Sequence, residues 1–309
     1  MNILENVELA PLTTFEIGGP AKYFIEVKNS DQLGAALDYA QTRKLPFFVL
    51  AGGSNVLIAD TGFNGVVIKI AFKELKVDTL NSQVYAEAGS SLMDCIFESA
   101  GAGLSGMESM YGIPGSVGGA ARGNAGAFGA EMVDVVKEIT ALNIETREIK
   151  TFANEDCFFS YRNSFFKKNT DWIIISVLLQ LEKETGGSAL KRAEEILALR
   201  NERQIQNIQS AGSFFMNPSV NQSIQDSFRK EKGTEARERR VPAGWLIEKS
   251  GFKGVCENNV CTGKRSPNYI INSGGASASS VRNLAESIRN KVLEKFAIEL
   301  HEEVMQVGF

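Results

Sequence analysis

The densest glycine segment of the chain, residues 112–129, restricts the fold more than any other feature. It reads Gly112-Ile113-Pro114-Gly115-Ser116-Val117-Gly118-Gly119 and continues as Gly123-Asn124-Ala125-Gly126-Ala127-Phe128-Gly129. So many glycines lose more backbone entropy on folding than a plain turn requires. Close approach of the backbone to a ligand or to another backbone offsets that loss. The segment therefore predicts either a dinucleotide site or a tightly packed glycine corner.

A second glycine turn follows a predicted β-α-β unit between Phe24 and Ile70. Phe24–Val27 is typical of a strand, Ser30 is a candidate cap for a helix from Asp31, and Phe47–Leu50 is typical of a short buried strand. That strand leads into Ala51-Gly52-Gly53-Ser54-Asn55. Such a turn at the carboxyl end of a strand is a common place for nucleotide phosphates, although a plain structural turn has the same composition. Neither glycine segment has the G-x-G-x-x-G pattern of nicotinamide-binding folds, which favours a flavin.

The rest of the chain predicts further strands, a linker and two long helices. Residues 133–142 and 172–181 are strand-like, and 184–188 form a plausible linker, where we place the main domain boundary. A charged amphipathic helix is predicted over 189–206. A second helix, capped at Ser279-Ser280, has its apolar residues at Val281, Leu284, Ala285, Ile288, Val292 and Phe296.

The last segment changes to the two-residue period of a strand. Ile298, Leu300 and Val304 share one face, and Glu299, His301, Glu303 and Met305 share the other. His301 is the only histidine in 309 residues. Proton transfer must therefore depend on other groups elsewhere in the chain.

Composition excludes several classes of protein. The chain is 43% hydrophobic and 23% charged, as is usual for globular proteins, and its net charge of −4 argues against nucleic-acid binding. No apolar run reaches the roughly 18 residues of a membrane span, and the start lacks a secretory signal, so we expect a cytoplasmic protein. The four cysteines are spaced too widely for a metal or redox pair, and we expect all of them to be reduced and no metal to be bound.

Eight motifs in order resemble those of the UDP-N-acetylenolpyruvoylglucosamine reductases. They are Thr14–Gly19, Leu50–Asn55, Gly112–Gly119, Tyr161–Ser164, Ala211–Phe215, Asn217-Pro218, Ala243–Glu248 and Glu302–Val304. Each motif alone has moderate specificity, but their order spans nearly the whole chain. The resemblance thus carries more weight than any single motif.

This resemblance implies an α+β protein. A vanillyl-alcohol-oxidase-like FAD-binding domain would span 1–188, with subdomains of about 1–70 and 71–188. An α+β substrate-binding domain would span 189–309, with Glu303 on its last strand. The implied reaction uses NADPH to reduce FAD, which then reduces the enolpyruvyl double bond of the UDP-sugar in peptidoglycan precursor synthesis. The spacing from Arg162 to Ser213 resembles the shorter subclass that lacks an inserted substrate loop, and we expect a monomer.

The resemblance also implies roles for individual residues. Arg162 and Glu303 would stabilise the negative charge that develops on the substrate carboxylate, and Ser213 would protonate the adjacent carbon. His301 would lie on the same strand face as Glu303 and could tune it. Cofactor contacts are expected from Gly52, Gly53, Ser54, Asn55, Val56, Gly112, Ile113, Pro114, Gly115, Ser116, Gly118, Gly119, Asn124 and Gly126. Substrate contacts are expected from Phe128, Arg200, Asn217 and Lys264.

Four departures from the family pattern lie in the expected substrate domain. Met216 replaces a usual Lys or Arg, Asn258-Asn259 replace Gly-Gly, Ser266 replaces a common histidine, and Met305 replaces an Arg found in some members. They leave two alternatives open: another non-covalent flavin oxidoreductase of the same fold, or a non-catalytic nucleotide-sugar binder. The choice between NADPH and NADH also stays open.

Overall fold

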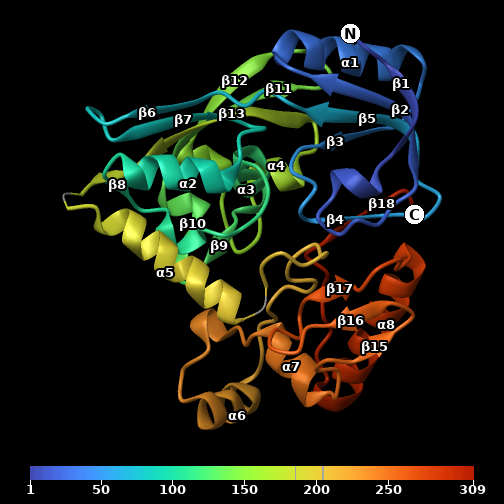
Figure 1. Ribbon diagram of the computed structural model, residues 1–309, viewed down its shortest axis with the longest axis vertical. Coiled ribbons are helices and arrows are strands. Elements are labelled where there is room, and N and C mark those ends of the chain that lie inside the picture. Colours follow the sequence, from blue (N-terminus) through green and yellow to red (C-terminus); the bar gives the residue numbers. More distant parts are fainter. Residues whose placement is uncertain (185, 204) are drawn as a thin grey trace. The chain divides into compact units, whose positions relative to one another are not determined.

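The chain forms two compact units. The computed structural model describes residues 1–184, 186–203 and 205–309 (Figure 1). Unit 1 comprises Met1–Val7, Ala21–Gly53 and Phe63–Asn201, and unit 2 comprises Glu8–Pro20, Ser54–Gly62 and Glu202–Phe309.

These units differ from the predicted domains 1–188 and 189–309. Helix α5 (Ser188–Glu202) belongs to unit 1, because Arg192 in its second turn binds Glu108 and Glu184. Two early segments belong to unit 2. Residues 54–62 do so because β4 (Val56–Ile58) pairs in parallel with β18 (Met305–Val307), and in residues 8–20 the Phe15 carbonyl oxygen accepts from the Asn272 side chain at 3.1 Å. The predicted linker and the predicted helix over 189–206 each include a residue, 185 and 204 respectively, outside the described part of the chain.

The first sheet of unit 1 is built on the predicted β-α-β unit. Its strand order is β1-β2-β5-β3, and β5 pairs in parallel with both β2 and β3. The strands are β1 (Leu4–Glu8), β2 (Pro20–Val27), β3 (Phe47–Leu50) and β5 (Phe63–Ile70). Helix α1 (Ser30–Thr42) packs against β5 and buries the predicted face of Leu33, Ala36, Leu37 and Ala40. Its N-cap is Asn29, whose side chain accepts the N–H of Gln32, rather than the predicted Ser30.

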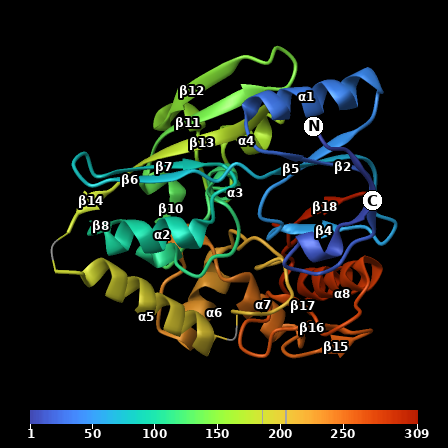
Figure 2. The ribbon, with the colours of Figure 1, turned by 45° about the horizontal axis from the view of Figure 1, so that its top comes forward.

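The second sheet of unit 1 is antiparallel, with the order β12-β11-β13-β7-β6. Its strands are β6 (Leu75–Asp78), β7 (Gln83–Glu87), β11 (Val136–Asn143), β12 (Ile149–Ala153) and β13 (Trp172–Gln180). Helices α2 (Leu92–Gly101), α3 (Val117–Gly123) and α4 (Phe165–Lys168) pack on it, as both ribbon views show (Figures 1 and 2). One hydrophobic core joins the two sheets of this unit.

Short elements complete unit 1. β8 (Leu104–Ser105) pairs with β14 (Glu182–Lys183), and β9 (Gly126–Ala127) pairs with β10 (Ala130–Glu131). Three 3-10 turns are η2 (Glu108–Met110), η3 (Met132–Asp134) and η4 (Asn154–Cys157).

Unit 2 has its own core around a small sheet. Strands β15 (Cys256–Glu257), β16 (Val260–Thr262) and β17 (Ile270–Asn272) form an antiparallel sheet. Its helices are α6 (Gln222–Lys232), α7 (Ala243–Lys249) and α8 (Ala278–Phe296), with 3-10 turns η1 (Ala10–Leu12) and η5 (Arg237–Arg239). The predicted apolar face of α8 is buried except for the half-buried Phe296, and the cap is Ser277 rather than Ser279.

Two predictions for unit 2 are wrong. Cys256 and Cys261 form a disulfide, because a two-residue hairpin turn places them directly across from each other, with Cα atoms 4.1 Å apart. Asn258 and Asn259 both have positive φ, at 49° and 64°, which Asn tolerates better than most residues. Glu303 lies before β18 and not on it, so the predicted strand alternation does not hold there.

Among the described residues, no helix combines the length and apolar character needed to span a membrane. Within the same ranges, no three or more His, Cys, Asp or Glu side chains are grouped as metal ligands.

Candidate active site

The two glycine segments predicted as cofactor loops touch each other in unit 1. A Cβ atom on Gly52 would lie 2.6 Å from the Cα atom of Gly115 and 2.9 Å from the backbone nitrogen of Ser116. No side chain fits at that distance, so residue 52 must be glycine here. Between Gly52 and Gly115 the chain therefore forms the tightly packed glycine corner that was one of the two alternatives. The same contact brings both glycine segments to one cavity.

Helix α3 is fastened to the end of β7 through its first N–H groups. Val117 donates to the carbonyl oxygen of Ser90 at 2.9 Å, and Gly118 donates to that of Ala88 at 3.0 Å. Gly119 donates to the Ser116 hydroxyl at 3.2 Å. The backbone donors of Gly118 and Gly119 thus hold the helix in place.

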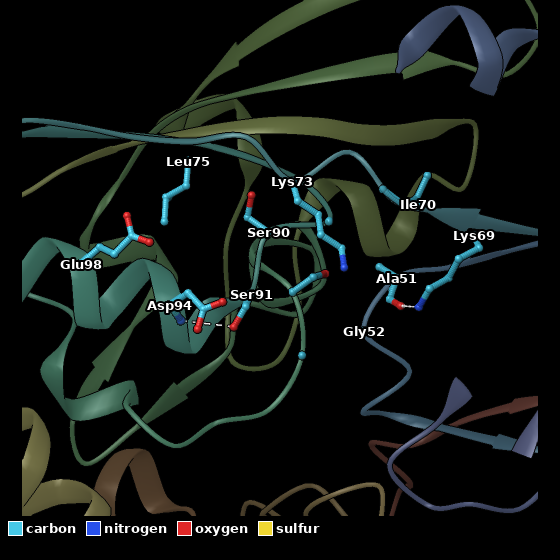
Figure 3. Close-up of a pocket in the computed structure, with 13 residues that line it drawn as sticks. Ala51, Gly52, Lys69, Ile70, Lys73, Leu75, Ser90, Ser91, Asp94 and Glu98 are labelled. Atoms are coloured by element: carbon cyan, nitrogen blue, oxygen red, sulfur yellow. Dashed lines mark hydrogen bonds between the residues drawn. The ribbon is translucent and has the colours of Figure 1, made fainter. Parts of the chain in front are cut away.

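A cavity of about 400 Å³ opens beside the contact between Gly52 and Gly115 (Figure 3). Its lining includes three of the predicted cofactor residues, Gly52, Gly115 and Ser116. It also includes charged side chains that the sequence motifs did not indicate, namely Lys69, Lys73, Asp94 and Glu98. These four come from β5, the segment after it, and α2, so only the fold brings them together.

Arg162 is held against the second half of the glycine segment. It has a φ of 54° in a tight turn whose ends, Ser160 and Asn163, exchange two backbone hydrogen bonds. Its guanidinium donates to the carbonyl oxygens of Gly126 at 2.8 Å and Asn124 at 3.4 Å. These bonds orient the guanidinium.

Asn124 and Phe128 have different environments. Asn124 is fully buried, and its amide donates to Glu131 and the Ser160 carbonyl and accepts from the Val133 N–H. Its side chain is therefore committed to holding this loop. Phe128 is 39% exposed at the tip of the β9–β10 hairpin and has a φ of 50°, a costly conformation for a bulky residue.

Ser213 and Glu303 come together in unit 2. The N–H of Glu303 donates to the carbonyl oxygen of Phe214 at 2.8 Å. Ser213 forms an isolated antiparallel β-bridge with Tyr269. The Asn55 side chain donates to the Glu303 carbonyl oxygen at 3.1 Å. Asn55 thus positions the backbone of Glu303, a link that the sequence did not indicate.

The predicted substrate residues lie in contrasting settings. The Asn217 side chain accepts the Ala243 N–H at 2.9 Å, and Asn217 lines a cavity of about 440 Å³ with Met216, Arg240 and His301. Lys264 is exposed, whereas Arg200 is only 5% exposed near the end of α5.

Comparison with known proteins gives matches along the whole chain. A family profile described as "FAD binding domain" matches residues 21–151. A second, described as "UDP-N-acetylenolpyruvoylglucosamine reductase, C-terminal domain", matches residues 203–307. The fold and the first match define a flavoprotein of the FAD-binding class.

Full-length relatives give the family. The UDP-N-acetylenolpyruvoylglucosamine reductase of Carboxydothermus hydrogenoformans is 37% identical over 99% of this chain and 94% of its own length. The reductase of Solibacter usitatus is 33% identical over 97% of this chain and 95% of its own length. The crystal structure of the Thermus caldophilus reductase superimposes with a TM-score of 0.77 at 28% identity, covering 99% and 98% of the two chains. The chain belongs to the UDP-N-acetylenolpyruvoylglucosamine reductase family, and the predicted α+β fold with an FAD-binding domain is confirmed.

Proposed function

We propose that this chain uses NADPH and FAD to reduce the enolpyruvyl group of UDP-N-acetylenolpyruvoylglucosamine, giving UDP-N-acetylmuramate for peptidoglycan synthesis. The observation that carries the proposal is the 37% identity to a reductase of that name across 99% of the chain. Both the FAD-binding half and the reductase-specific half are matched. Membership of the family means an FAD-dependent oxidoreductase acting on a carbon–carbon double bond.

The residues of unit 1 fit an FAD diphosphate. Gly52 presents bare backbone where a Cβ atom would collide with Gly115, and Lys73 lines the same cavity with a positive charge. Backbone N–H groups and cations are the usual partners of phosphate. When bound, FAD supplies the hydride chemistry that no side chain provides.

The chain's own residues would handle the charge and the proton on the substrate. Addition of hydride to the double bond moves negative charge into the neighbouring carboxylate. Arg162, oriented by the Gly126 carbonyl, would donate to that carboxylate, and Glu303 would donate a second hydrogen bond if protonated. The Ser213 hydroxyl would then protonate the adjacent carbon.

Substrate contacts are proposed for Phe128, Arg200, Asn217 and Lys264. Met216 and His301 border the cavity beside Asn217, so the departure at 216 removes a cation from that wall. Arg240, from the same wall, donates to the Asn217 carbonyl oxygen at 3.3 Å and keeps a positive charge there. We further propose that the protein works in the cytoplasm as a monomer and does not bind nucleic acid.

The decisive experiment is a two-step titration of the purified protein. Oxidised-flavin absorbance should bleach with NADPH under anaerobic conditions and return when the UDP-sugar is added. Bleaching without return on addition of the UDP-sugar would support an oxidoreductase with another acceptor. Absence of flavin would leave only a non-catalytic binder. Repeating the first step with NADH gives the nucleotide preference.

A further inference from the structure

The cavity beside Gly52 and Gly115 has charges of opposite sign on its two sides. Figure 3 shows Lys69 and Lys73 toward the glycine turn, and Asp94 and Glu98 on the opposite side, projecting from α2. Leu75 lies on the same side as Asp94 and Glu98. A ligand with an anionic part and a part rich in hydrogen-bond donors would meet this arrangement in one direction only.

The two lysines are not equivalent. The Lys69 amine donates a hydrogen bond to the Ala51 carbonyl oxygen, so it holds the glycine turn. Burial lowers the pKa of Lys69, and the nearby charge of Lys73 lowers it further. Within the described part of the chain, Lys73 makes no salt bridge and is exposed toward the cavity. An anion placed between the two amines would relieve their repulsion, and Lys73 is the amine that can reach it.

The opposite side is acidic. Asp94 and Glu98 are four residues apart on α2, so they lie on the same helix face and both line the cavity. Ser91, the N-cap of α2, accepts the Asp94 N–H at 3.2 Å and fixes the start of that face. Carboxylates accept hydrogen bonds from hydroxyl and amino groups and repel phosphate. Ribose hydroxyls and an adenine amino group have the matching chemistry.

We propose that Lys73 neutralises the diphosphate of FAD while Asp94 and Glu98 accept hydrogen bonds from its adenosine, so that the three side chains select FAD over shorter flavins. The inference rests on the proposed placement of FAD at this cavity. Its selectivity follows from the length of each ligand. Riboflavin has neither phosphate nor adenosine, FMN has a phosphate only, and FAD has both.

The test is a comparison of three flavins on the full chain. Flavin is removed by dialysis against bromide, and readdition of FAD must restore the original spectrum. Binding of FAD, FMN and riboflavin is then followed by flavin fluorescence. For Lys73→Met we expect FAD and FMN affinity to fall about tenfold and riboflavin affinity to stay constant. For the double variant Asp94→Ala/Glu98→Ala, which removes both acceptors, we expect about a tenfold loss for FAD, whereas FMN affinity should stay constant or rise because two charges that repel phosphate are gone.

Salt and matched variants separate this effect from general damage. Raising the ionic strength should weaken FAD binding to the unmodified protein more than to Lys73→Met. Salt screens the attraction between Lys73 and the diphosphate, and the variant no longer has that attraction. Lys76→Met removes the same charge from β6, where Lys76 pairs with Glu74 and does not line the cavity, and should leave all three affinities unchanged. Lys73→Arg should restore most of the FAD affinity.

The possible results test the two parts of the proposal separately. Unchanged FAD affinity in Lys73→Met, or equal losses for all three flavins, would overturn the role of Lys73. Equal losses of FAD and FMN in the acidic double variant would overturn the adenosine assignment. If the unmodified chain binds none of the flavins, the flavin site itself is wrong, which separates failure of the proposed function from failure of this inference.

Discussion

The backbone N–H of Glu303 donates to the carbonyl oxygen of Phe214, the residue after Ser213, across 2.8 Å. Phe214 and Phe215 are each 1% exposed, and Phe215 also bridges to Glu302. The loop that carries Ser213 and the segment that carries Glu303 are therefore fixed to each other through their backbones. Substitution of either side chain should leave that framework in place, so each can be tested separately.

Replacing Ser213 with alanine should split the two half-reactions. We expect flavin reduction by NADPH to keep its rate, while reoxidation by the UDP-sugar slows about a thousandfold, as for loss of a proton donor. Stopped-flow absorbance measures both steps. Ser227→Ala, on the exposed face of α6, is the matched control and should change neither rate. Equal slowing of both half-reactions by Ser213→Ala would count against Ser213 as the donor.

Gly52→Ala should destabilise unit 1 and weaken flavin binding. The new Cβ atom would lie 2.6 Å from the Cα of Gly115, and backbone cannot move aside as a flexible side chain would. We expect a loss of about 1–3 kcal/mol in the free energy of unfolding. Gly101→Ala is the control, because an added Cβ meets nothing within 4 Å at the end of α2. Chemical denaturation compares them, and equal stability of the two variants would refute the contact.

Glu108→Gln should make the free energy of unfolding depend less on pH in the acid range. Burial acts to raise the pKa of Glu108, but bonds from backbone N–H groups, including that of Gly106, and from Arg192 outweigh it and hold the pKa below 4.5. A depressed folded-state pKa stabilises the protein above pH 4.5, and this stabilisation is lost as the pH falls through the folded value. The variant should lose about 1–3 kcal/mol at pH 7 and less at pH 3.

The control for this acid effect is Glu286→Gln, an exposed substitution on α8. Urea unfolding at pH 7, 5 and 3 should show a difference between Glu108→Gln and the unmodified protein that shrinks with acid. A difference that is constant across pH would mean that the carboxylate charge of Glu108 contributes nothing to stability.

The cysteines should divide into two classes on thiol titration. Denatured protein without reductant should show two thiols, from Cys95 and Cys157, and four after reduction of Cys256–Cys261. In the folded protein the first two should react slowly, since burial raises the pKa of each to about 12. Cys256→Ser/Cys261→Ser should cost about 2 kcal/mol of stability, as expected for a short cross-linked loop. Four thiols without reductant would contradict the disulfide.

The sequence predicted features that depend on local periodicity. The buried faces of α1 and α8 and the strands β2, β3 and β13 follow from apolar spacing alone. The predicted caps were displaced by one or two residues, because the neighbouring polar residues 29 and 30, and likewise 277, 279 and 280, can all act as caps and only the backbone conformation selects one.

Features that depend on distant pairing were missed. Membership of residues 54–62 in unit 2 follows from the β4–β18 pairing, which no local pattern indicates. One cavity is lined by Lys73, Asp94 and Glu98, which come from separate segments. In the sequence each of them is typical of a solvent-exposed charged side chain. The disulfide had a local signal, two cysteines flanking Glu-Asn-Asn-Val, in which Asn-Asn suits a two-residue hairpin.

Anaerobic absorbance spectroscopy of the purified protein, with the product quantified, separates a UDP-sugar reductase from the other candidate functions. We expect a yellow protein whose flavin band bleaches on addition of NADPH and returns in full, with one equivalent of UDP-N-acetylmuramate formed, when UDP-N-acetylenolpyruvoylglucosamine is added. A protein without bound flavin, or a reduced flavin that the UDP-sugar does not reoxidise, would contradict this expectation.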